Sequence, residues 1–126
     1  MRKLKAMRTA AALVLATGAV MTASVTQAQA KPAATIHGCP EGYVCIYPEN
    51  AGWNNDVPSH KYYTYGYHNL SNMYGIHRII NNQTGGATMQ TCTGYNGTGC
   101  EGHLPGGGWS IDKDMTPINS IRLNRP

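Results

Sequence analysis

Turn-forming residues interrupt the sequence so often after residue 38 that no long helix can form there. Corners of Asn, Asp and Gly, which accept a positive φ at low cost, occur at 54–56, 85–86, 96–97 and 106–108. The runs between the corners are short and of β type, and none keeps an apolar period of 3.6 residues. These runs are 43–47, 61–65, 76–81, 87–92 and 118–123. The pattern predicts an all-β sandwich or barrel.

The sequence also contains an internal repeat. Ile76, Ile79 and Asn82 recur in order as Ile118, Ile121 and Asn124, and Cys45 and Trp53 match Cys92 and Cys100. Two copies of one unit with about four strands each explain this order, and four strands are what a Greek key needs. We therefore predict two keys packed face to face, the first over about 38–84 and the second over about 85–124.

The core of this sandwich is expected to use the inward-facing apolar residues of both copies. The chain contains no Phe, and the tyrosines at 62, 63, 65 and 67 are expected to cover the rim. The candidates are Val44, Ile46, Trp53, Val57, Leu70, Ile76, Ile79, Met89, Leu104, Trp109, Ile111, Ile118, Ile121 and Leu123.

The first thirty residues have a different composition from the remainder. A basic segment with Arg2, Lys3, Lys5 and Arg8 precedes an apolar stretch, which ends in the small-x-small sequence 28–30. This order is typical of a secretory signal peptide over residues 1–30, and the apolar stretch is short for a membrane anchor. We expect an extracellular protein with a flexible leader at 31–37 and a domain at 38–126.

The charge balance changes once the signal peptide is set apart. The whole chain has a formal charge of +4, but the four basic residues of the export segment account for it. Residues 31–126 are formally neutral with His uncharged. A neutral domain gives no basic patch for nucleic acid or an anionic membrane, so neither is an expected partner, and we expect a monomer.

Four cysteines in an exported domain of this size predict two disulfides, because the core is modest and the exterior is oxidising. Three connectivities exist. The local one, Cys39 with Cys45 and Cys92 with Cys100, is favoured because each pair encloses its own turn residues. A zinc site is not expected, since neither pair has the usual spacing of zinc ligands.

Several of these elements together resemble a known family. They are Cys39-Pro-x-Gly-x-x-Cys45, the aromatic hairpin at 47–53, the second cysteine pair and the closing run 118–123. Over about residues 38–124 the chain resembles secreted βγ-crystallin-like proteins, and among them the Streptomyces metalloproteinase inhibitor family. The resemblance implies a secreted protein, without enzymatic activity of its own, that blocks thermolysin-like zinc peptidases.

The same resemblance implies where inhibition would occur. In the family, a loop between the second pair of half-cystines enters the peptidase, and the reactive bond follows the first cysteine of that pair. Here this loop runs from Cys92 to Cys100. Thr93 stands where the family has a bulky apolar residue, Gly94 follows, and Tyr95 is the one large side chain of the loop.

An alternative function on the same scaffold is calcium binding or another noncatalytic extracellular role, whether structural, toxin-like or in interactions. Crystallin-type calcium sites use Asn or Asp side chains shortly before a Ser/Thr-Ser pair. Asp112, Asp114 and Ser120 are the weak candidates here, because Met115 and Thr116 stand where the amide or acidic pair is expected. No cofactor is expected.

An enzyme is not predicted. The five histidines lack the His-Glu-x-x-His spacing, no serine lies in a nucleophile elbow, and no two carboxylates have catalytic spacing.

Overall fold

The computed structural model describes residues 34–126, and the predicted signal peptide lies outside them. The strands are β1 (Val44–Ile46), β2 (His60–Tyr62), β3 (Gly66–Asn69), β4 (Ile76–Asn81), β5 (Thr88–Cys92), β6 (Cys100–Pro105), β7 (Trp109–Asp114) and β8 (Ser120–Asn124). A single 3-10 turn, η1 (Asn54–Asp56), is the helical element of this part of the chain. The all-β prediction is therefore confirmed. Within residues 34–126 no helix is long and apolar enough to cross a membrane.

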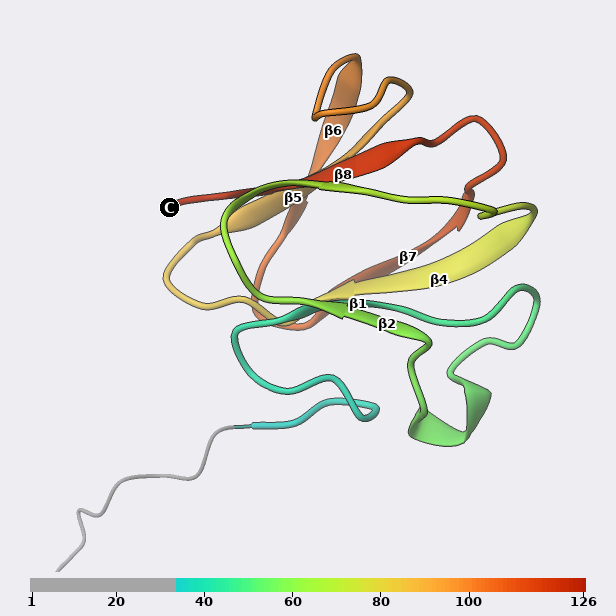
Figure 1. The fold of residues 1–126 in the computed structure, drawn as a ribbon. Coiled ribbons are helices and arrows are strands. Elements are labelled where there is room, and N and C mark those ends of the chain that lie inside the picture. Colours follow the sequence, from blue (N-terminus) through green and yellow to red (C-terminus); the bar gives the residue numbers. More distant parts are fainter. Residues whose placement is uncertain (1–33) are drawn as a thin grey trace, which may run out of the picture. The chain divides into compact units, whose positions relative to one another are not determined.

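The strands form two antiparallel sheets, which appear as two layers in Figure 1. The first has the order β2-β1-β4-β7 and the second the order β3-β8-β5-β6. Each sheet therefore takes three strands from one half of the chain and one strand from the other half. The crossing strands are β3 and β7, the third strand of each half.

The pairing registers define which positions of the two halves correspond. Ile46 lies opposite Ile79, and Thr91 lies opposite Ile121. If Ile79 is matched with Ile121, then Ile46 corresponds to Thr91 and Cys45 to Gln90, two residues from its predicted match Cys92. The registers therefore do not allow both predicted matches. A shift of two keeps a side chain on the same face of a strand, so the alternation of the sequence cannot detect this disagreement.

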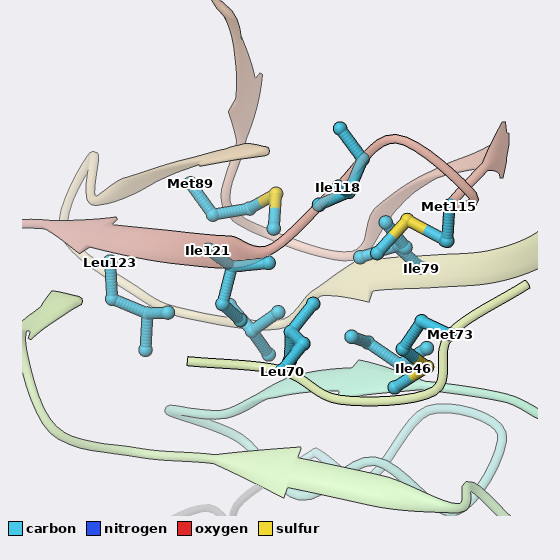
Figure 2. Packing of buried hydrophobic residues seen from close by; sticks show 10 residues of the cluster. Ile46, Leu70, Met73, Ile79, Met89, Met115, Ile118, Ile121 and Leu123 are labelled. Carbon is cyan, nitrogen blue, oxygen red and sulfur yellow. The ribbon is translucent and has the colours of Figure 1, made fainter. Parts of the chain in front are cut away.

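Most of the buried apolar side chains lie between the sheets. Figure 2 shows Met89, Ile121 and Leu123 from one sheet pointing toward Ile46 and Ile79 from the other. The complete cluster is Val44, Ile46, Leu70, Met73, Ile79, Met89, Met115, Ile118, Ile121 and Leu123, with Tyr62 and Leu104 packed against it. Burial of this set is the main apolar contribution to folding.

Four of the predicted core residues are exposed instead: Val57, Ile76, Trp109 and Ile111. Ile76 and Ile79 are three residues apart on one strand, so they point to opposite faces of the sheet. Trp109 and Ile111 belong to β7, which lies at the edge of its sheet. Val57 follows η1 in a connection between strands. Trp53 packs against a different apolar cluster.

This other cluster is formed by Cys39, Cys45, Tyr47 and Ile80, with Ile36, Tyr43 and Trp53 packed against it. Because Cys45 and Ile80 alternate with core residues on β1 and β4, they lie on the outer face of the first sheet. The segment before β1 covers them. The Cys39–Cys45 disulfide fixes this covering segment to the sheet.

The folded part begins earlier than the predicted boundary at residue 38. Ile36 exchanges two backbone hydrogen bonds with Cys39, and the Asn82 side chain donates to the Ala34 carbonyl at 3.0 Å. Residues 34–37 of the predicted flexible leader are therefore bonded to the domain. A short polar and apolar segment of this kind gives no sequence signal, because its partners lie far along the chain.

The folded protein is expected to lose stability at high pH as Tyr47 deprotonates. Tyr47→Phe is expected to remove this part of the loss. The Tyr47 hydroxyl donates to the His37 carbonyl at 2.6 Å, and burial, with a smaller effect of Asp56, raises the pKa of Tyr47 to about 12. Because this pKa is above the ordinary value of 10.0, the contribution is complete below pH 10.0 and is lost as the pH rises through about 12.

Urea unfolding at pH values on both sides of 10.0 measures this effect. The wild type should lose stability more steeply than Tyr47→Phe. The control Tyr74→Phe, which changes an exposed tyrosine, should keep the wild-type dependence. Equal slopes for Tyr47→Phe and the wild type would contradict the assignment.

Candidate functional site

The predicted inhibitory loop closes the hairpin of β5 and β6 and stands at the top of Figure 1. Cys92 ends β5, Cys100 begins β6, and the two residues lie directly opposite each other in the ladder. They form a disulfide, as Cys39 and Cys45 do, so both predicted bridges are confirmed. The loop is therefore covalently closed where it leaves the sheet.

Within the loop, the backbone continues the hairpin and then turns tightly. Thr93 N–H donates to the Gly99 carbonyl at 3.0 Å, and Gly94 N–H donates to the Thr98 carbonyl at 2.9 Å. At the tip, Asn96 and Gly97 have φ values of 59° and 70°, the pair of positive angles that a type I′ turn requires. Asn-Gly is the favoured sequence for that turn, so the local sequence determines the shape of the tip.

Ser120, the first residue of β8, anchors the loop to the second sheet. Its hydroxyl donates to the Gly94 carbonyl at 2.7 Å and accepts the Gly97 N–H at 3.0 Å. The Ser120 side chain is fully buried. One hydroxyl thus satisfies two backbone groups on opposite sides of the loop.

Two asparagines add further anchors. Asn119 donates its side-chain amide to the Thr93 carbonyl at 2.8 Å, and its backbone N–H donates to the Cys92 carbonyl at 2.9 Å. Asn69 and Asn96 are paired through two hydrogen bonds, of 2.7 Å from the Asn96 backbone N–H and 3.0 Å from the Asn69 amide. The loop is therefore bonded to β8 and to the end of β3 as well as to itself.

On the outer side of the loop, the side chains of Thr93 and Tyr95 take no part in these anchoring bonds to β3 and β8. Thr93 and Tyr95 are exposed, Tyr95 to 55%. A small hollow of about 140 Å³ lies beside Tyr95, and Tyr74 and Asn119 contribute to its wall. The carbonyl of Cys92, at the bond expected to be reactive, points inward to Asn119, so the loop presents its side chains rather than this carbonyl.

The three weak calcium candidates each have a protein partner. Asp112 accepts two hydrogen bonds from the Arg78 guanidinium, at 2.7 and 3.0 Å, which hold the pKa of its carboxyl below the ordinary value. Asp114 accepts the Thr116 N–H, which likewise lowers its pKa. Ser120 is the loop anchor described above. Among residues 34–126, no three His, Cys, Asp or Glu side chains are gathered as a metal site would need.

Comparisons of the chain with models of protein families, with curated proteins and with solved structures found no match.

Ser120→Ala is expected to loosen the loop. The variant leaves the Gly94 carbonyl and the Gly97 N–H without their buried partner, which costs on the order of 1 to 3 kcal/mol of unfolding free energy. Denaturant unfolding measures that loss, and amide hydrogen exchange should show a faster rate at Gly97. Ser110→Ala, at an exposed serine of β7, is the control and should leave both unchanged. Unaltered exchange at Gly97 in Ser120→Ala would contradict this assignment.

Proposed function

We propose that the protein is a secreted inhibitor of peptidases that acts through the Cys92–Cys100 loop. The observation that carries this proposal is that the loop is closed by a disulfide and anchored by hydrogen bonds to the buried Ser120 while its outer side chains are exposed. A loop that is ordered before binding loses little conformational entropy in the complex. A disulfide at its base also holds the two ends together if the loop is cut.

The proposed target is a thermolysin-like metallopeptidase, on the strength of the family resemblance in the sequence. Such a peptidase would receive the exposed side chains of Thr93 and Tyr95. Tyrosine is well suited to this role, because it supplies a large contact area with few rotatable bonds and is enriched at protein interfaces.

We further propose that the sandwich consists of two Greek keys in a βγ-crystallin-like arrangement. The exchange of β3 and β7 between the sheets supports this, because each half then has the same strand order. Ile79 on β4 and Ile121 on β8 are both buried in the core between the sheets, as equivalent positions of two such keys would be.

Secretion is part of the same proposal. The two disulfides are consistent with an extracellular or otherwise oxidising compartment. The signal peptide that would direct export falls in residues 1–30, outside the described part of the chain.

Titration of the folded protein, with both disulfides formed, against a panel of metallo-, serine and cysteine peptidases tests the function. Inhibition of a thermolysin-like enzyme at a one-to-one ratio is the expected result. An absence of inhibition across the panel would reject the proposal. Parallel melting curves with and without calcium would then test the alternative, since a bound ion raises the melting temperature by mass action.

A further inference from the structure

A second feature lies away from the outer side of the loop, at the edge of the sandwich where β6 and β7 face each other. It is a cleft of about 370 Å³ that includes Met89, Leu104 and Ile111 in its lining. Leu104 lies directly opposite the core residue Met89, and Ile111 directly opposite the core residue Ile79. Directly opposed residues of a sheet point to the same face, so both side chains face the space between the sheets.

The inward-facing positions of β7 are nevertheless open to solvent. Ile111 is 38% exposed, and Trp109, two residues before it and thus on the same face of β7, is 64% exposed. A register shift between Met89 and Thr91 marks an irregularity in the pairing of β5 with β6, of the kind that bends an edge strand. The space between the sheets is therefore not filled by the protein's own side chains at this edge.

The opposite edge of the sandwich, between β2 and β3, is filled. There the rings of Tyr62 and His68 lie 4.9 Å apart, and Tyr62 packs against the main core. The His60 ring is stacked with Tyr62 at 6.3 Å and extends this aromatic group. Aromatic rings therefore close the edge between β2 and β3.

The two edges can be compared position by position once Ile79 is matched with Ile121. Tyr62 lies opposite Val44 and Leu104 opposite Met89, while His68 lies opposite Ile121 and Ile111 opposite Ile79. On this match, and because the two halves have the same strand order, Leu104 and Ile111 are the counterparts of Tyr62 and His68. Two aliphatic side chains then stand where the other edge has two rings, and both of them line the cleft.

We propose that the β6–β7 cleft is a binding site for a small, uncharged aromatic molecule of one or two rings. The volume is within the range of small-molecule sites. Met89, Leu104 and Ile111 form the apolar part of the wall, and the polar residues Gln90, Thr91, Glu101, His103 and Lys113 complete the lining. The Met89 thioether is a favourable contact for an aromatic ring.

The charged groups at the cleft favour a neutral ligand. Lys113 and Glu101, which both contribute to the lining, form an ion pair of 2.6 Å. Each charge is therefore already neutralised by the other. A charged ligand would have to give up water beside a neutral pair, which costs free energy without a compensating partner.

Nuclear magnetic resonance titration of the wild-type protein with indole tests the site directly. The methyl signals of Met89, Leu104 and Ile111 are expected to shift in a saturable way. The methyl signal of Val44, opposite Tyr62 at the filled edge, is the internal control and should not move. Benzoate, a charged ring, should bind roughly tenfold more weakly or worse, since its carboxylate loses water. No saturable shift up to the solubility limit of indole would overturn the proposal.

The correspondence of the two edges supplies matched variants. The double variant Leu104→Tyr, Ile111→His places the rings of the filled edge in the cleft, and should weaken indole binding by roughly tenfold or more. The reverse variant Tyr62→Leu, His68→Ile should open the other edge and create a second binding event. Unchanged indole binding in the first variant would show that the ring binds elsewhere.

If the double variant does not fold, the single change Ile111→Phe serves instead. It fills part of the cleft from an edge strand and is expected to weaken indole binding in the same direction. Full wild-type affinity in this folded variant would reject the assignment. Peptidase inhibition is measured separately and does not enter this test, so either proposal can fail without the other.

Discussion

The double variant Cys92→Ser, Cys100→Ser is expected to inhibit the proposed thermolysin-like target more weakly than the wild type, by up to roughly thirtyfold to a hundredfold. Opening the bridge restores conformational freedom to the loop, and closing such a short loop in a free chain is worth about 2 to 3 kcal/mol, which is the upper limit here because β5 and β6 also hold the loop ends. The anchors from Ser120 and Asn119 keep part of the loop in place, so the loss should be large but incomplete.

The matched control is the other bridge. Cys39→Ser, Cys45→Ser opens a disulfide on the outer face of the first sheet, which should lower the unfolding free energy and leave inhibition by the folded fraction unchanged. Inhibition constants, measured at a temperature where all three proteins are folded, separate the two effects. Equal inhibition by the Cys92/Cys100 variant and the wild type would show that loop closure has no part in binding.

Thr93→Leu is expected to strengthen inhibition of a thermolysin-like peptidase by tenfold to a hundredfold. The Thr93 side chain is exposed on the outer side of the loop, and filling an apolar pocket with a larger side chain is worth roughly 1 to 3 kcal/mol. Thr93→Leu removes one long hydrogen bond, from the Thr93 hydroxyl to the Gly99 carbonyl at 3.4 Å. The backbone bonds of Thr93 to Gly99 and Asn119 remain, so the loop should keep its shape.

Two variants complete this test. Thr93→Ala should weaken inhibition only slightly, because it removes little contact area. Thr84→Leu enlarges an exposed threonine outside the loop and should have no effect on the inhibition constant. If Thr93→Leu and Thr84→Leu behave alike, the side chain at 93 does not enter a pocket of the peptidase.

Five of the strands, β1, β2, β4, β5 and β8, and both disulfides could be predicted because they depend on local chemistry, whereas β3, β6 and β7 were not among the predicted runs. Asn96-Gly97 specifies a tight turn wherever it occurs, and each cysteine pair encloses its own turn residues. The predicted match of Cys45 with Cys92 disagrees with that of Ile79 with Ile121, because a register between distant strands is decided by packing. A displacement by two residues leaves the facing of every side chain unchanged.

Exposure was harder to predict than strand position. Ile111 faces inward, as the alternation predicts, but it is exposed because β7 is an edge strand and no bulky side chain from β6 covers it. Whether an edge is covered depends on a strand from another part of the chain. The sequence of β7 alone does not contain that information.

The ends of the candidate loop were predicted from the cysteines, but its anchors were not. Asn119 and Ser120 reach backbone groups 26 residues away in the chain, and no local rule connects such positions. One signal was present: a polar pair interrupts the apolar run between Ile118 and Ile121. A buried polar side chain in such a run needs a hydrogen-bond partner, so this interruption could have indicated that these two residues bind backbone groups of a neighbouring loop.

The exchange of strands between the sheets also has a consequence for the order in which the protein can assemble. β3 is hydrogen bonded to β8, the last strand, and to no other strand of the described chain. A ribosome delivers β3 long before β8, and so does a translocation channel that releases the amino end first. The second sheet therefore cannot be completed until β8 is available to β3. All strands of the first sheet precede β8, so the first layer can be completed before the second.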